Sequence, residues 1–140
     1  MRIKAFIILV VLIVSFNSMA LAADVVLIIN KANPMATVSN QDAQNIFLGK
    51  KTTWDTGKKI VLVDQQNQRV LDFFAKSIVK KSSQQYATYW KKALFTGTGI
   101  PPKAVDDDAE VKAFITGNKD AIGYISSAAL DGSVKKLDLN

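Results

Sequence analysis

Two residue types are missing from this sequence: its 140 residues include no cysteine and no histidine. Without cysteine the chain cannot form disulfides, even in an oxidising compartment. Without either residue type it also lacks the usual ligands of a zinc site, a cysteine or histidine nucleophile dyad and a histidine general base. The sequence therefore predicts no cofactor, no metal site and no enzymatic activity.

Acidic residues are fewer than basic ones, with 12 aspartates and glutamates against 18 lysines and arginines. Without Arg2 and Lys4, which lie near the N-terminus, the chain has 16 basic residues against 12 acidic ones and a net charge of +4. The lysines are scattered, often in pairs, and form no basic stripe, so nucleic acid is not an expected partner. Such pairs are typical of solvated faces; the alternative is a mildly basic surface that attracts anions or acidic partners.

The longest apolar run extends from Ala5 to Phe16. It follows Arg2 and Lys4 and is followed by the small-residue exit Ala20-Leu21-Ala22, an arrangement typical of a cleaved secretory signal. The run has about 12 residues, short of the roughly 20 that span a bilayer as a helix. The sequence predicts a signal peptide over residues 1–22, cleavage after Ala22, a periplasmic location and one domain over residues 23–140. A retained membrane anchor is the alternative.

Buried strands are expected to alternate with helices along this domain. Continuous or alternating apolar patterns predict strands over 25–30, 59–63, 121–125 and 134–140, the last at a sheet edge. Capping residues followed by apolar residues at helical spacing predict helices that begin near Ser39, Asn67, Ser82 and Asp107. The alternation predicts an α/β fold, with a mostly parallel sheet of about four strands flanked by helices.

The turns that leave the predicted strands are candidate ligand sites, because the carboxyl ends of parallel strands and the following helix starts meet at one edge of a sheet. After the second strand, Asn67 could cap a helix whose start, with Gln68 and Arg69, could hold a carboxylate or an oxyanion. Asp64 favours the alternative, an ordinary capped helix, because a carboxylate repels an anion. The candidate ligand-binding residues are Asn33, Asn67, Gln68, Arg69 and Ser126.

Other polar or glycine-rich stretches have simpler structural explanations. The segment "FTGTGIPP" follows a predicted helix and lacks the pattern of a phosphate-binding loop, so its glycines are expected to end the helix and form a turn. The run Asp106-Asp107-Asp108 complements a helix N-terminus, although a hard cation is an alternative. Trp54 and Trp90 are expected in or beside the core, with a ligand platform as the alternative.

Three stretches, "NPMATVSNQDAQNIFLGKKTTWDTGKKIVLVDQ", "YWKKALFTGTGIPP" and "DAIGYISS", together resemble the phosphate-binding proteins of ABC transporters. The resemblance covers residues 25–130 and is closer still to the small exported relatives of these receptors. It implies one lobe of a type 2 periplasmic-binding-protein fold. It also implies a non-enzymatic function linked to uptake of phosphate or another small anion, with a membrane transporter as a partner.

The sequence departs from this family in two ways. Receptors of the family have two lobes that close on the ligand, which needs roughly twice this chain length. The larger receptors also place an arginine and a Ser-Gly-Thr after the second strand, where this chain has "DQQNQR". A ligand-free interaction module that docks on an envelope sensor, porin or transporter is therefore the alternative function. Its expected contact is the turn with Lys50, Lys51 and Trp54, and a homodimer is a further expected assembly.

Overall fold

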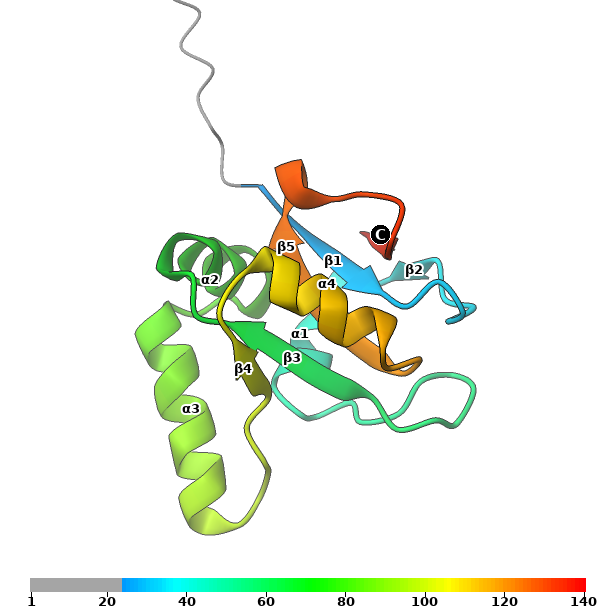
Figure 1. Ribbon diagram of the computed structural model, residues 1–140. Coiled ribbons are helices and arrows are strands. Elements are labelled where there is room, and N and C mark those ends of the chain that lie inside the picture. Colours follow the sequence, from blue (N-terminus) through cyan, green and yellow to red (C-terminus); the bar gives the residue numbers. More distant parts are fainter. Residues whose placement is uncertain (1–23) are drawn as a thin grey trace, which may run out of the picture.

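A computed structural model describes residues 24–140, and the predicted signal peptide over residues 1–22 lies outside the described residues (Figure 1). The strands are β1 (Val25–Ile29), β2 (Thr37–Val38), β3 (Val61–Gln65), β4 (Lys103–Val105), β5 (Ala121–Ser126) and β6 (Lys135–Leu139). The α-helices are α1 (Asn40–Phe47), α2 (Gln68–Phe74), α3 (Ser83–Thr96) and α4 (Asp108–Thr116). A π-helical turn, η1 (Ala75–Val79), continues α2, and a 3₁₀ turn, η2 (Ser127–Ala129), follows β5. Among the helices of residues 24–140, none combines the length and the apolar character that a membrane span needs.

The six strands form one sheet in the order β2-β6-β1-β5-β3-β4. Three pairings are parallel, β2 with β6, β3 with β4 and β3 with β5. The strand β1 is antiparallel to both of its neighbours, β5 and β6. The α/β fold and the mostly parallel sheet are confirmed, with two strands more than expected, because the short β2 and β4 carry no apolar run that marks them in the sequence.

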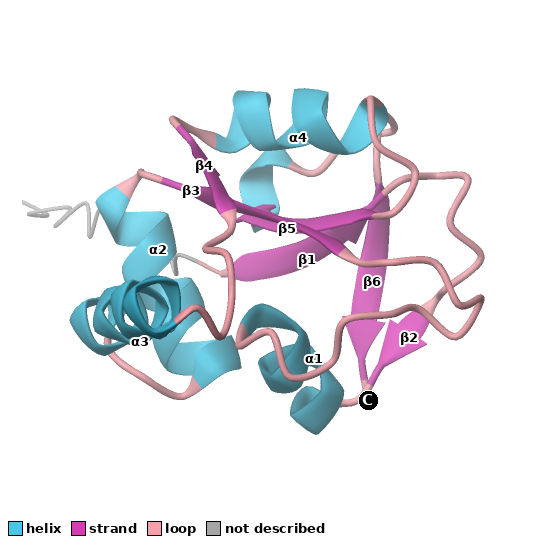
Figure 2. Ribbon diagram, turned by 90° about the horizontal axis from the view of Figure 1, so that it is seen from below, coloured by secondary structure: helices cyan, strands magenta, loops and turns pink. Residues whose placement is uncertain are grey.

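Helices cover both faces of the sheet, as Figure 2 shows with α4 on one side and α1, α2 and α3 on the other. The alternation of side chains along β1 follows these two layers. Leu27 and Ile29 belong to the core cluster under α1, α2 and α3, whereas Ile28 belongs to the cluster under α4. Both faces of β1 are therefore buried, which explains its continuous apolar run.

Side-chain caps start the helices where the sequence predicts them. Ser39 Oγ accepts a hydrogen bond from the amide of Asp42 at 3.0 Å, at the start of α1. At the start of α3, Ser82 and Gln85 form a reciprocal capping box with distances of 3.1 and 2.9 Å. Asp107 caps α4. These bonds satisfy amide donors that the first turn of a helix leaves without a backbone partner.

Two predicted strands differ from the observed ones. The second strand, expected over 59–63, runs from Val61 to Gln65, because Lys59 pairs with Thr53 in a short hairpin and Gln65 pairs with Val105 of β4. The strand expected at an edge, β6, is inside the sheet, because the two-residue strand β2 pairs with its outer side.

Aromatic rings fill the core between the sheet and α2. Phe74 stacks on Tyr124 of β5, with ring centroids 3.6 Å apart, and meets Phe47 of α1 edge to face at 4.7 Å. All three side chains have a relative exposure of 0%. Burial of each ring contributes on the order of 2 to 3 kcal/mol, so this contact ties α1, α2 and β5 into one unit.

Candidate functional site

The carboxyl ends of β3 and β5 lie at one edge of the sheet, because these two strands are parallel. We call this region the carboxyl-end notch and define it by Gln65, Asn67, Asp108 and Ser126. Gln65 ends β3, Ser126 ends β5, Asn67 caps α2, and Asp108 is the first residue of α4. The structure thus brings Asn67 and Ser126 to the same edge, together with a carboxylate that the sequence analysis did not include in the site.

Asn33 does not join this group, and its expected place beside Ser126 is wrong. Because β1 is antiparallel to β5, Val25 pairs with Ser126, and the far end of β1 reaches the opposite edge of the sheet. Asn33 is 5% exposed there and forms part of a turn, in which its Oδ1 accepts from the amide of Met35 at 3.0 Å. Its carbonyl accepts a hydrogen bond from Lys135.

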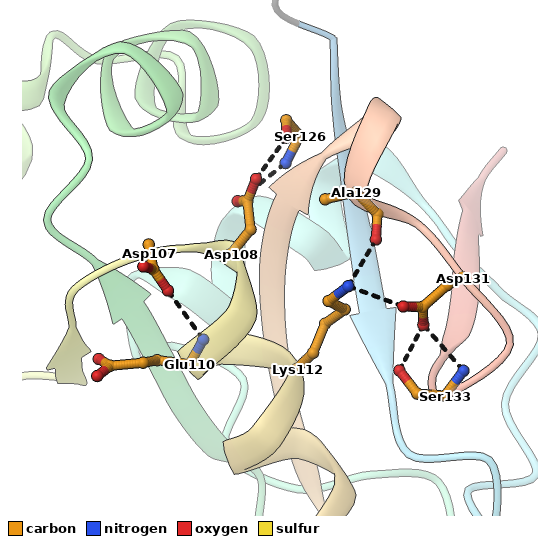
Figure 3. Close-up of polar contacts among 8 residues, drawn as sticks. All are labelled: Asp107, Asp108, Glu110, Lys112, Ser126, Ala129, Asp131 and Ser133. Carbon is orange, nitrogen blue, oxygen red and sulfur yellow. Dashed lines mark hydrogen bonds and ion pairs between the residues drawn. The ribbon is translucent and has the colours of Figure 1, made fainter.

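Asp108 accepts hydrogen bonds from the donor groups of the notch. Its carboxylate accepts from the amide of Ser126 at 3.2 Å and from the hydroxyl of the same residue (Figure 3). Gln65 Nε2 donates to Asp108 Oδ1 at 2.8 Å and to the carbonyl of Tyr124 at 2.9 Å. An internal carboxylate therefore lies against the amide and hydroxyl of Ser126, donors that an oxyanion ligand would need.

The residues at the start of α2 are also engaged in internal contacts. Asn67 Oδ1 accepts from the amide of Val70 at 3.3 Å, as expected for a helix cap. Gln68 Nε2 donates to Asp72 at 2.7 Å and to the hydroxyl of Ser83 at 3.3 Å, which links α2 to the start of α3. Arg69 is exposed, and it also takes part in an interaction within the folded chain. These contacts fit the capped-helix alternative of the sequence analysis.

Asp64 brings a second carboxyl group close to the notch, but its side chain points into the core. Tyr86 donates a hydrogen bond to Asp64 Oδ2 at 3.0 Å. Burial raises the pKa of Asp64 to about 6, because desolvation outweighs the hydrogen bonds from Tyr86 and Tyr124. Two acceptor atoms here, Asp64 Oδ1 and Gln65 Oε1, are buried without a hydrogen-bond partner in the described part of the chain. The polar atoms at this end of β3 are therefore mostly hydrogen-bond acceptors, and one of the groups is acidic.

A separate charge cluster lies one turn further along α4, on the side that faces the segment after β5 (Figure 3). Lys112 Nζ donates to Asp131 at 2.8 Å and to the carbonyl of Ala129 at 2.9 Å. Hydrogen bonds from Lys112 and then from Ser133 lower the pKa of Asp131 below its usual range. This cluster fixes the loop after β5 onto α4. Among residues 24–140, no group of acidic side chains is arranged to hold a metal ion.

Two hollows lie along α3. One, of about 360 Å³, borders the notch and is lined by residues that include Asp64, Gln68, Ser83, Tyr86 and Lys91. The other, of about 620 Å³, lies between α3 and the start of β3; its charged lining residues are three lysines, with no carboxylate. These lysines are Lys51, Lys59 and Lys103. The larger hollow is therefore not at the predicted ligand site.

The turn predicted as a partner contact is only partly exposed. Trp54 is 3% exposed and donates from Nε1 to the carbonyl of Asp120 at 2.9 Å, so it belongs to the core and is wrong as an exposed contact residue. Lys51 forms ion pairs with Asp42 at 3.2 Å and Asp55 at 3.7 Å. Lys50 is exposed. The expectation that Trp54 lies in or beside the core is confirmed.

Sequence reasoning missed Gln65 and the contact of Asp108 with Ser126. Gln65 offered a signal, since it is a large polar residue that follows the apolar run of β3 after Asp64 alone. Asp108 offered none beyond its place at a helix start, because its contacts come from strands 43 and 18 residues away in the chain.

Comparison with known proteins finds no matching protein-family model and no match among curated protein sequences. Solved structures do match. An ABC-type phosphate transport receptor from Vibrio cholerae is 20% identical with a TM-score of 0.64, over 82% of this chain and 45% of the receptor. A phosphate ABC transporter substrate-binding protein with bound phosphate, from Clostridium perfringens, is 24% identical with a TM-score of 0.65, over 82% of this chain and 44% of that one. The chain has the fold of one lobe of these proteins.

A third structure, PstS from Borrelia burgdorferi, has the same fold at 13% identity, with a TM-score of 0.55 over 83% of this chain and 47% of PstS. The chain thus spans less than half the length of the phosphate receptors that it matches. The similarity to one lobe, which the resemblance in the sequence predicts, is confirmed at the level of the fold.

Proposed function

We propose that this chain is an exported, non-enzymatic binding module that serves the uptake of phosphate or another small anion. The observation that carries the proposal is the fold, which 82% of this chain shares with phosphate transport receptors. An apolar N-terminal segment typical of a secretory signal fits a function in the periplasm. The absence of cysteine and histidine from all 140 residues fits a binding function better than catalysis.

The ligand of this module is a small oxyanion at the carboxyl-end notch. Ser126 and the start of α2, with Asn67, Gln68 and Arg69, lie at the edge where parallel strands present amide donors. An anion there competes with the carboxylate of Asp108 for the donors of Ser126. One open lobe also leaves much of a ligand in water. We therefore expect a dissociation constant no tighter than about 1 mM, a binding free energy of about −4 kcal/mol.

Calorimetric titration with phosphate, sulfate and acetate tests this proposal. We expect saturable heat from phosphate in the millimolar range, and tighter binding to Asp108→Asn, because this change removes the competing negative charge. Asp106→Asn is the matched control. Asp106 lies two residues before Asp108 and carries the same charge, but it is exposed and has no hydrogen bond to Ser126 among the described contacts. Absence of heat from all three anions, with wild type and both variants folded, would contradict a function in anion binding.

The internal contacts of the notch favour a second candidate function, a ligand-free module that docks on an envelope partner or on a second copy of itself. In this case the lobe keeps its fold and recognises a sensor, porin or transporter through exposed residues such as Lys50. Site-specific cross-linking from position 50 in cells, compared with the same cross-linker at the exposed Lys119, tests it. A discrete adduct from position 50 alone supports docking through this turn, and equal patterns from both positions exclude it.

A further inference from the structure

The free end of α3 carries a cluster of exposed apolar side chains that neither candidate function uses. Leu94 is 58% exposed, Phe95 is 93% exposed, and Ile100, in the loop that follows, is 86% exposed. We call these residues and the turn between them the α3 tip (residues 94–100). In Figure 1 this end of α3 and its loop extend away from the sheet. Large apolar side chains exposed together on a projection indicate a binding surface.

The fold holds this tip in a defined shape. Gly97 has φ of 69°, a left-handed conformation suited to glycine, and ends the helix. The amide of Thr98 donates to the carbonyl of Ala93 at 2.9 Å, which folds the loop back on the helix. Gly99 lies against Trp90, where an added Cβ would come within 3.1 Å of the ring. Trp90 is 7% exposed, and its Nε1 donates a hydrogen bond to the carbonyl of Phe47. The tip therefore packs against a side chain that is itself held in the core.

The chain segment that carries the tip has charges of one sign. From Phe73 to Val105 the sequence contains six lysines and no aspartate or glutamate. Lys91 and Lys92 are exposed and lie one helical turn before Phe95, so two lysines flank the apolar side chains on the side toward the start of α3. Lys103 is exposed at the other end of the loop and lines the larger hollow with Lys59 and Ile100.

We propose that the α3 tip inserts into the interface of an anionic membrane. Exposed aromatic and aliphatic side chains with lysines before and after them in the chain match a lipid surface, whose acyl region takes the apolar groups and whose phosphates take the ammonium groups. Charge argues against a second copy as the occupant, because two such tips would bring lysine against lysine. Shape argues against a flat protein interface, because the apolar residues form a projection. The proposal stands whether or not the notch binds an anion.

Sedimentation with lipid vesicles tests the proposal. Residues 23–140 are suitable, because the sheet is complete and both core clusters are drawn from residues 27–137. We expect binding to vesicles of equal parts phosphatidylglycerol and phosphatidylcholine, weakened by salt, and little binding to phosphatidylcholine alone. The double change Lys91→Gln/Lys92→Gln should weaken binding about 25-fold, since each lysine near an anionic surface contributes a factor of about five.

Phe95→Ser should weaken binding at least about tenfold without loss of folding, since the side chain is almost fully exposed. The matched controls are Leu139→Ser, an exposed apolar residue on β6, and Lys31→Gln/Lys119→Gln, two exposed lysines outside the tip. Both controls should bind as the wild type does, and circular dichroism confirms that all variants are folded. Equal binding by Phe95→Ser and wild type, or no binding to anionic vesicles, would overturn the proposal. A dimer that Phe95→Ser dissociates, without lipid binding, would also overturn it and assign the tip to contact between copies.

Discussion

At the scale of single residues, Asp64 places a carboxyl group in the core, where hydrogen bonds from Tyr86 and Tyr124 compensate only part of the cost of desolvation. Its pKa is raised to about 6 in the folded chain, against an ordinary value of 3.8. The folded state therefore holds a proton more tightly than the unfolded state does. The stability linked to this proton is fully present below about pH 4 and is lost as the pH rises to about 6.

Asp64→Asn should remove this pH dependence. Two pKa units correspond to about 3 kcal/mol, so the free energy of unfolding of the variant should exceed that of the wild type by up to this amount at pH 8. Urea unfolding at several pH values between 4 and 8 measures it. Asp55→Asn, whose carboxylate is 71% exposed, is the control and should leave the slope unchanged. A wild-type stability that rises between pH 4 and pH 6 relative to Asp64→Asn would show that the charged form is the favoured one.

Gly123 of β5 is a second residue on which the fold depends. A Cβ at this position would meet Val63 Cγ1 at 2.6 Å and Val111 Cγ1 at 2.8 Å, between the sheet and α4. Gly123→Ala should therefore lower the free energy of unfolding by about 2 kcal/mol through overpacking. Gly132→Ala is the matched control, because its Cβ would meet nothing within 4 Å. Thermal unfolding compares the two, and equal melting temperatures would contradict the close packing of β5 against α4.

Much of this residue-scale picture could be predicted from the sequence. The caps at Ser39 and Ser82 follow from local pairs three residues apart, and the burial of Trp54 follows from its size and apolar character. The unusual pKa of Asp64 could not be predicted, because it depends on Tyr86 and Tyr124, which are 22 and 60 positions away. Local chemistry is readable in a single sequence, whereas contacts between distant elements are not.

At the scale of elements, Asp108 joins three of them, since its carboxylate, at the start of α4, accepts from Gln65 of β3 and Ser126 of β5. Asp108→Ala should cost about 2 kcal/mol in the free energy of unfolding, because partly buried donors lose their acceptor. Asp106→Ala should change it by less than about 0.5 kcal/mol, since that side chain is exposed. Chemical denaturation of both variants measures the difference, and similar losses would mean that the carboxylate acts only through the helix dipole.

The direction of β1 was the element-scale feature that the sequence could not supply. A continuous apolar run is the same in a parallel and an antiparallel strand that is buried on both faces. The assumption of a parallel β1 placed Asn33 in the ligand site, and the antiparallel pairing with β5 moves it to the other edge. By contrast, β3 and β5 are parallel, which confirms that Asn67 and Ser126 lie at one edge of the sheet.

At the scale of the whole molecule, the proposed export predicts a processed N-terminus. Protein recovered from the periplasm of a bacterial host that expresses the full chain should begin at Ala23, as the small-residue exit before it indicates. Intact-mass measurement shows this directly, because loss of residues 1–22 changes the mass by a defined amount. Ala20→Lys/Ala22→Lys is the test variant and should retain the segment. Full-length protein in the cytoplasm from the unaltered chain would exclude export.

We propose that the carboxyl-end notch of this phosphate-receptor-like lobe is an anion site weakened by its own carboxylate at Asp108. Nuclear magnetic resonance tests it most directly, by titrating residues 23–140 with phosphate at constant ionic strength and following each backbone amide. We expect saturable shifts at Ser126 and at residues 67–70 with a midpoint in the millimolar range, and tighter binding in Asp108→Asn. Amides that do not respond at this edge, or that respond most strongly at the opposite edge near Asn33, would contradict it.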